Sequence, residues 1–464
     1  MPSGEQRPER WFTGVVFGLY AAATLVVALH HEPWRDEADP WLLIRDGGVA
    51  TMLARTGYVG MPALWYLAIT PLVKLGLPYV SMTLLNLAFA WAAALLFLIA
   101  APFPRYVRTL FVFSYFAAYE YSVLARPYAL AMLLLFCALA TWRHRATRPM
   151  PFAISVALLA NATPHTLILG AMLGAAFLYD RGRKARAPLA VMLLGGMLSF
   201  VQLAPPADAP EGHVLRGASV QRVASAVSSA FFPHLYVSAG WLFGALLIGG
   251  AALAIGNRAA PQIFLWGSLA LLSVLYGLVW MGGVRHGGPI LLAVVGALWL
   301  ARVDRPLRAE GEVMLLVGVA LALGCISSVR MWVDDVRQPF SGSKELAEHL
   351  KRTGLDRQEI AAHRPPHGGA VLPYLPGKKF YYAGMEQYGS YMLWNAQYNR
   401  AYGMYDHQAA ELARRHFGER PFLFLVTRPL GRNVRGYRLV FTTSLPFAHL
   451  DEQYFLYSSV PERR

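Results

Sequence analysis

The segment HEPWRDEADPW, residues 31–41, places Asp36, Glu37 and Asp39 within four positions, directly after the apolar run 11–29. A carboxylate held at a lipid–water boundary has the chemistry of a general base toward a hydroxyl, or of a metal ligand. Two tryptophans flank the charges, and tryptophan favours such a boundary. The alternative is a solvated loop whose charges only mark the end of a helix.

Three further segments carry ionisable residues between apolar runs. Glu120 and Arg126 stand in YEYSVLARPYAL, His165 in NATPHTLIL, and Arg285 with His286 in VRHGGP. Ionisable groups at membrane depth are costly and usually face a cavity or a partner, although long side chains at helix ends also reach the interface. Arginine suits phosphate because its planar fork donates two parallel hydrogen bonds. A lone histidine is more often structural than catalytic.

The composition is that of a membrane protein. Of 464 residues, 56% are hydrophobic and only 15% are charged, whereas soluble proteins average about 25% charged. Much of the net charge of +15 lies in short arginine-rich clusters between apolar runs, which is typical of cytoplasmic loops and argues against nucleic acid as a partner. Cys137 and Cys325 both lie in apolar runs, which argues against a disulfide framework and a cysteine metal site.

About eleven apolar segments are candidates for transmembrane helices, which need roughly 20 apolar residues each. They lie near residues 11–29, 80–101, 106–120, 127–142, 150–163, 165–179, 188–204, 237–256, 262–281, 288–302 and 313–331. The first has no convincing small-residue cleavage site, so we interpret it as a retained signal anchor. The sequence therefore predicts an α-helical polytopic membrane protein.

The basic loops predict its orientation. Segment 61–78 is apolar enough to span, but a span there would export every basic cluster after residue 78, against the tendency of Lys and Arg to remain cytoplasmic. We therefore expect it to lie at the membrane surface, within a large first exterior loop, residues 30–79. The four charged segments then all emerge on the exterior face of the cytoplasmic (inner) membrane.

Residues 333–464 predict a soluble α/β domain on the exterior (periplasmic) side, after a transmembrane module of residues 1–332. Ser343–Thr353 and Asp406–Phe417 have helical patterns, and strand-like runs occur at PFLFLVT, YRLVFTT and QYFLYSS between Gly and Pro residues. About 130 residues suffice for one small domain.

Together these features resemble the polytopic GT-C glycosyltransferases, a superfamily that includes the protein O-mannosyltransferases and the lipid A aminoarabinose transferase. The resemblance rests on the acidic pair Asp36-Glu37 after the first span and on the tyrosine-rich segment that contains Tyr128. His165 and Arg285-His286 occupy the places of a histidine and an arginine pair that open later spans. The likeness covers roughly residues 10–330.

One departure from the family pattern concerns an acidic residue. Many relatives have Ser-Gln-Glu-Ala-Arg where this chain has Ser-Val-Leu-Ala-Arg, residues 122–126. The glutamate is missing at that place, and Glu120 is its candidate replacement. The segment after residue 332 matches no activity that the resemblance implies.

The resemblance implies transfer of a sugar from a polyprenyl phosphate to a hydroxyl of a glycan, lipid or protein acceptor, among membrane lipids. Asp36 is then the catalytic base, with Glu37 beside it. The resemblance also implies a set of residues that bind the phosphate and the sugar. These candidate substrate-binding residues are Glu120, Arg126, Tyr128, His165, Arg285 and His286. Family members differ in their use of a divalent metal, so no cofactor is certain, and Asp36 and Glu37 are the candidate ligands.

Two other classes fit the composition. A transporter or flippase of lipid-linked sugars also needs charge at membrane depth, but spread along a path and commonly with internal repeats. No repeat is found, and the charge gathers on one side. A non-catalytic scaffold with an exterior binding domain is the third class, and the carboxylates of the first loop argue against it.

The positive-inside tendency makes a topology prediction. A reporter fused after Arg183 should be cytoplasmic, and one fused after Gly342 should be exterior, because an odd number of crossings separates the two points. Paired phosphatase and fluorescent-protein fusions measure this. The reverse pair of results would contradict the orientation.

Overall fold

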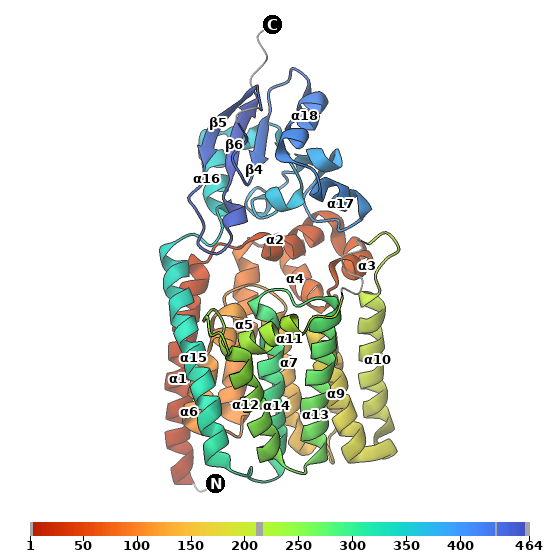
Figure 1. Cartoon of the computed structure of the whole chain (residues 1–464), viewed down its shortest axis with the longest axis vertical. Coiled ribbons are helices and arrows are strands. Elements are labelled where there is room, and N and C mark those ends of the chain that lie inside the picture. Colours follow the sequence, from red (N-terminus) through yellow and green to blue (C-terminus); the bar gives the residue numbers. More distant parts are fainter. Residues whose placement is uncertain (1–2, 210–216, 432–433, 460–464) are drawn as a thin grey trace.

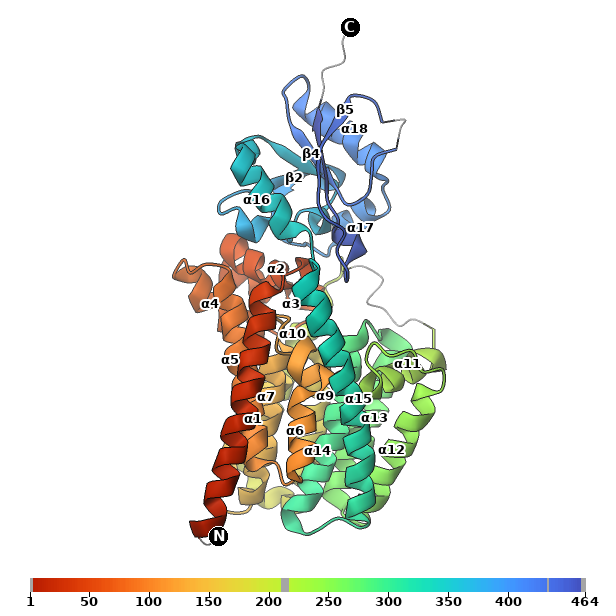
Figure 2. The ribbon, with the colours of Figure 1, turned by 90° about the vertical axis from the view of Figure 1, so that its left-hand side faces the viewer.

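The computed structural model describes residues 3–209, 217–431 and 434–459. An elongated helical bundle carries a smaller domain at one end, and the N-terminus lies at the opposite end (Figures 1 and 2). The helices of the bundle run broadly parallel to the long axis of the molecule. The acidic segment lies where the bundle meets the C-terminal domain.

The bundle confirms the expected helical membrane protein. Within the described residues, six helical segments are long and apolar enough to cross a bilayer, namely Pro8–His30, Val80–Ala100, Arg186–Leu203, Ala259–Val279, Val284–Asp304 and Glu310–Arg337. The first belongs to α1 (Ser3–His30), which packs against α15 (Glu310–Arg337). The last segment continues past residue 332, the predicted end of the transmembrane module, to Arg337.

The other expected spans are shorter or interrupted, so the structure does not establish a count of eleven. The bundle helices are α5 (Val80–Ala100), α6 (Arg105–Phe113), α7 (Tyr128–Thr141), α8 (Met150–Ala160), α9 (Pro164–Arg181), α10 (Arg186–Leu203), α11 (Val220–Phe231), α12 (Gly240–Ile255), α13 (Ala259–Val274) and α14 (Gly288–Asp304). At 1.5 Å per residue, α8 extends only about 16 Å, roughly half of a 30 Å hydrocarbon core.

The expected span 106–120 is broken at Ser114. Helix α6 ends at Phe113, and a π-helical turn, Phe116–Glu120, follows. The buried Asn86 of α5 then donates to the carbonyls of Tyr121, Ser122 and Leu124. The side chain of Asn86 thus replaces the backbone partners that a continuous helix would supply, and it holds the irregular chain that leads to Arg126.

The acidic segment is a helix, which corrects the expectation of an open loop. Helix α2 (Arg35–Leu42) begins after Trp34, whose backbone N–H donates to the Glu37 side chain at 3.3 Å. A Glu at the third helical position that reaches back to the cap is half of a capping box. The remainder of segment 30–79 also folds, as α3 (Gly48–Val59) and α4 (Leu64–Lys74).

Helix α4 is the apolar segment expected at the membrane surface. Its 11 residues span about 16 Å, too short to cross alone. Figure 1 shows α4 at the end of the bundle beneath the C-terminal domain. The length of α4 is compatible with the expected surface position.

The C-terminal domain has a six-stranded mixed sheet of order β3-β2-β1-β4-β6-β5. Its strands are β1 (Ile360–Ala362), β2 (Phe380–Tyr382), β3 (Gln387–Gly389), β4 (Leu423–Val426), β5 (Tyr437–Thr442) and β6 (Phe455–Ser459). Helices α16 (Ser343–Thr353) and α18 (Asp406–Phe417) confirm the two predicted helices, and α17 (Ala396–Tyr402) is additional. The three predicted strand runs became β4, β5 and β6. Strands β1 to β3 were missed because three residues show no periodicity.

Helix α2 belongs to two hydrophobic cores. Ala38 and Leu42 pack with α16 and one face of the sheet, whereas Trp41 packs with α3, α4 and α5. Residues on one helix point in different directions, so α2 joins the C-terminal domain to the bundle. The carboxylate-bearing helix is therefore held from both sides.

Candidate active site

Four of the predicted site residues form one chain of ion pairs. The Asp36 carboxylate lies 3.1 Å from Arg126 Nη1 and 3.6 Å from Arg285 Nη1. Arg285 Nε lies 3.9 Å from the Glu120 carboxylate, and Arg126 also donates to the Asp36 backbone carbonyl at 2.7 Å. Residues from α2, from the chain before α7 and from the start of the α14 span thus meet at the end of the bundle.

Asp36 is the most accessible member of this cluster. Its side chain is 30% exposed, against 15% for each arginine and 9% for Glu120. The Arg285 guanidinium also lies 5.1 Å from the ring centroid of Trp34, within the range of a cation–π contact. Trp34 therefore helps to hold Arg285, and Asp36 is the member of the cluster that a substrate can reach most easily.

Charge controls the ionisation of Asp36. Burial acts to raise the pKa of Asp36, but Arg126, Arg285 and Arg35 outweigh it and hold the pKa below its ordinary value. The carboxylate is thus ionised at neutral pH. It is also a weaker base while both arginines remain against it.

Glu37 faces away from Asp36 into a buried network. Its carboxylate accepts from the Ala125 backbone N–H at 2.5 Å and from His31 at 3.0 Å, and His31 contacts Asp335 of α15 at 2.8 Å. Burial acts to lower the pKa of His31, but the carboxylates of Asp335 and Glu37 raise it to about 10. A charged imidazolium therefore bridges two carboxylates.

This geometry does not fit a divalent metal at the acidic pair. Both Glu37 oxygens already accept hydrogen bonds, and Asp36 points at two guanidinium groups. A cation there would face two nearby positive charges and only one available carboxylate. The mechanism proposed for this site uses no metal.

The remaining predicted residues lie in an aromatic stack beside the ion pairs. The rings of His165 and His286 stack at 4.9 Å, and Tyr128 meets His286 edge-on at 6.3 Å. Both ring nitrogens of His165 lack a hydrogen-bond partner among the described residues. His165 is thus held by packing and makes no contact with the acidic residues that the structure describes.

The C-terminal domain adds residues that the sequence did not suggest. His449 stacks on Trp34 at 3.7 Å, and Asp451 lies 2.6 Å from Arg35. The Arg35 backbone N–H donates to Glu452, whose pKa burial raises to about 7. These residues lie more than 400 positions from α2, at a single 3-10 turn, Leu450–Glu452, that is too short to show periodicity, so nothing in the sequence marks them as neighbours.

One more residue that the sequence did not suggest lies on the bundle side. His234 Nε2 contacts the Tyr115 hydroxyl at 2.8 Å, and the same hydroxyl donates to Glu120. His234 also has a positive φ of 55°, which is uncommon outside glycine. The chain of polar contacts therefore extends from Asp36 to the segment between α11 and α12.

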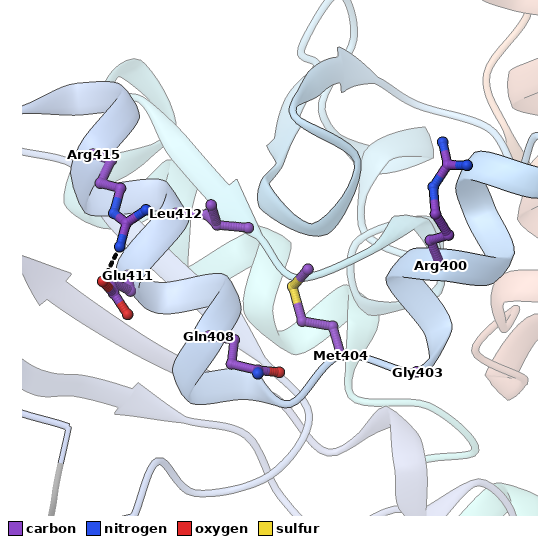
Figure 3. A pocket seen from close by; sticks show the side chains of 7 residues that line it. All are labelled: Arg400, Gly403, Met404, Gln408, Glu411, Leu412 and Arg415. Atoms are coloured by element: carbon purple, nitrogen blue, oxygen red, sulfur yellow. Dashed lines mark hydrogen bonds and ion pairs between the residues drawn. The ribbon is translucent and has the colours of Figure 1, made fainter.

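A shallow hollow of about 470 Å³ lies elsewhere, between α17 and α18 (Figure 3). It is lined by Arg400, Gly403, Met404, Gln408, Glu411, Leu412 and Arg415. None of the predicted site residues lines it. The ion-paired cluster, not this hollow, is the candidate active site.

Two solved structures have a fold similar to that of this chain. The chain is similar to ArnT from Cupriavidus metallidurans bound to undecaprenyl phosphate, with a TM-score of 0.58 and 11% identity over 97% of this chain and 99% of that chain. The apo state of that protein gives a TM-score of 0.52 and 12% identity over 97% and 98% of the two chains. Neither a protein-family model nor a curated protein sequence matches the chain.

The chain therefore shares its fold with ArnT, a likeness that agrees with the resemblance found in the sequence. Among solved structures, ArnT shares the arrangement over nearly its whole length, including the C-terminal domain. At 11–12% identity this likeness concerns the fold. The argument for a chemical activity comes instead from the ion-paired cluster of Asp36, Arg126, Arg285 and Glu120.

The contact between α2 and the C-terminal domain should depend on pH. Burial raises the pKa of Asp39 to about 7, although its carboxylate accepts from the Met392 backbone N–H at 2.7 Å. The folded state binds this proton more tightly than the unfolded chain, so the contribution of Asp39 to stability should fall as pH rises from about 4 to about 7. Asp39→Asn keeps the acceptor oxygen and removes the charge.

We expect Asp39→Asn to melt at a higher temperature than the parent at pH 8, with the difference shrinking toward pH 5. Thermal unfolding in detergent across this range measures it. The exposed Glu419→Gln is the matched control and should leave the profile unchanged. Parallel profiles for Asp39→Asn and the parent protein would contradict the assignment.

Proposed function

We propose that this protein is a membrane glycosyltransferase that moves a sugar from a polyprenyl phosphate to an acceptor hydroxyl on the exterior face of the cytoplasmic membrane. The observation that carries the proposal is one partly exposed carboxylate between two arginines at the end of the bundle. The fold it shares with ArnT, which binds undecaprenyl phosphate in its crystal structure, supports it.

The arginines suit the donor phosphate. Arg126 and Arg285 approach Asp36 from different segments, and each presents a planar fork that matches phosphate oxygens. Glu120 holds Arg285 from its other side. As the bond between the sugar and the phosphate breaks, charge develops on the leaving oxygen, and both guanidinium groups stabilise it electrostatically.

Asp36 is the base in this proposal. It takes the acceptor O–H proton while the acceptor oxygen bonds to the anomeric carbon, and the polyprenyl phosphate leaves with the electrons of the broken C–O bond. Bound phosphate competes with Asp36 for Arg126 and Arg285, which raises the basicity of Asp36 when the donor arrives. Asp36 therefore becomes a stronger base only after the donor has bound, which favours reaction in the donor complex.

The other residues position these groups. Glu37 fixes the start of α2 through His31 and the Ala125 backbone. Tyr128, His165 and His286 form an aromatic wall next to Arg285, which suits the apolar face of a sugar ring or the first isoprene unit. The acceptor class, whether glycan, lipid or protein, follows from none of these contacts.

The function is tested by transfer in vitro. Purified protein is given radiolabelled polyprenyl-phosphate sugars and a panel of hydroxyl acceptors in detergent. Acceptor-dependent release of polyprenyl phosphate, with the label on the acceptor, supports the proposal. Movement of intact donor between vesicle leaflets without cleavage would identify a flippase instead.

Arg285→Lys should weaken donor binding. Lysine keeps the positive charge but loses the fork that can hold two phosphate oxygens and contact Glu120 at once. We expect donor affinity to fall about tenfold, equivalent to about 1.4 kcal/mol, with folding retained. The exposed Arg330→Lys on α15 is the matched control. Unchanged donor affinity in titrations would show that Arg285 does not bind the donor phosphate and only marks the end of a helix.

Asp36→Asn should block turnover more than binding. The amide is nearly isosteric but accepts no proton, so we expect a loss of about 10²-fold or more in kcat. Donor affinity should change much less, because the two arginines remain. Asp334→Asn is the control, because Asp334 forms only a partly exposed ion pair with Arg330 within α15. Near-normal turnover would remove Asp36 from the mechanism.

A further inference from the structure

The sheet of the C-terminal domain has a topological switch point. Strand β1 pairs in parallel with β2 on one side and with β4 on the other, and the chain visits β2 before it returns to β4. In open α/β sheets, ligands bind outside the carboxyl ends of strands at such a point. His363 directly follows β1, and Asp406 is the first residue of α18, the helix before β4.

Three potential metal ligands meet at this point. His363, His367 and Asp406 each offer one ligand atom, and these atoms all lie within 4.8 Å of one another. Both histidines are buried, and the Asp406 side chain is 24% exposed. The cluster is separate from the ion pairs of α2, which it does not contact in the described part of the chain.

The hydrogen bonds of His363 leave one nitrogen facing a carboxylate. His363 Nε2 lies 3.1 Å from the Ala401 carbonyl and therefore donates its proton there. In the neutral ring the lone pair is then on Nδ1, which lies 2.7 Å from an Asp406 oxygen. Two lone pairs cannot face each other, so either a second proton or a cation lies between them. A metal-ligating histidine commonly donates its other N–H to a backbone carbonyl, as His363 does.

His367 supplies the second observation. Its Nδ1 has no hydrogen-bond partner among the described residues, although the residue is only 6% exposed. Its Nε2 accepts from Arg364 at 3.3 Å, a long contact that is easily replaced. A buried polar atom without a partner is rare. Because Nε2 accepts here, Nδ1 carries the ring proton, so Nδ1 binds a cation only if that proton moves to Nε2 and the contact with Arg364 is lost.

We propose that His363, His367 and Asp406 form a Zn²⁺ site in the C-terminal domain. Two imidazoles and one carboxylate are a donor set that zinc takes at about 2.0–2.2 Å, with a fourth position for water or substrate. Magnesium and calcium prefer oxygen ligands, which disfavours them here. The fourth position would open toward Asp406, the most exposed ligand.

This site would tie three segments of the domain together. Zinc would join the end of β1, the turn Pro365–His367 and the start of α18, none of which is linked by a disulfide. The protonated alternative, an ion pair of imidazolium His363 with Asp406, links only two of the three. Involvement of His367 therefore separates the two interpretations.

The experiment measures zinc bound to the full-length protein, purified in detergent without a histidine tag, stripped with chelator and dialysed against Zn²⁺. The site is counted as the difference in bound zinc between the parent protein and His367→Gln, so ions bound elsewhere cancel. His407→Gln is the matched control, because it removes an exposed histidine beside Asp406. Asp406→Asn is the second, milder variant, and Co²⁺ absorption reports the coordination geometry.

We expect a difference of about one equivalent for His367→Gln, at least tenfold weaker binding in Asp406→Asn and no change in His407→Gln. Co²⁺ should give the visible bands of a tetrahedral site in the parent protein and in His407→Gln, and should not give them in His367→Gln. Equal zinc content in the parent protein and both ligand variants would overturn the proposal. So would a protein that takes up no zinc at micromolar concentrations. Transferase activity enters none of these readouts.

Discussion

The buried carboxylate of Glu37 is the constraint on which the candidate site depends. It accepts from the Ala125 backbone and from His31, which in turn contacts Asp335 on α15. Breaking a buried ion pair by removing one partner typically costs about 3–5 kcal/mol. These contacts fix the start of α2 relative to α1, α7 and α15, and Asp36 is the residue before Glu37.

Helix α2 transmits this constraint to the rest of the molecule. Ala38 and Leu42 pack into the core of the C-terminal domain, and Trp41 packs into that of α3, α4 and α5. Trp34, just before the helix, contacts both His449 of the domain and the Arg285 guanidinium. The C-terminal domain is therefore part of the wall of the site, and its position and that of the acidic helix depend on each other.

Electrostatics accounts for the arrangement of the cluster. Two arginines and two carboxylates alternate, so each charge that leaves bulk water faces a partner of opposite sign. In the proposed function, the donor phosphate takes the place of the Asp36 carboxylate beside Arg126 and Arg285. In the proposed function the resting enzyme thus holds its phosphate-binding residues in place with its own base, and donor binding exchanges one anion for another.

The sequence by itself determined the helical membrane architecture and the bounds of α16 and α18, and it singled out Asp36, Arg126 and Arg285, which the structure brings together. These depend on local composition and periodicity, which a linear chain displays. Only the tertiary structure decided that Glu37 turns away from Asp36, that α2 is a helix and not an open loop, that His449 stacks on Trp34 and that His234 contacts Tyr115. Such contacts join residues far apart in the chain, and their energies come from burial and charge pairing that exist only once the chain has folded.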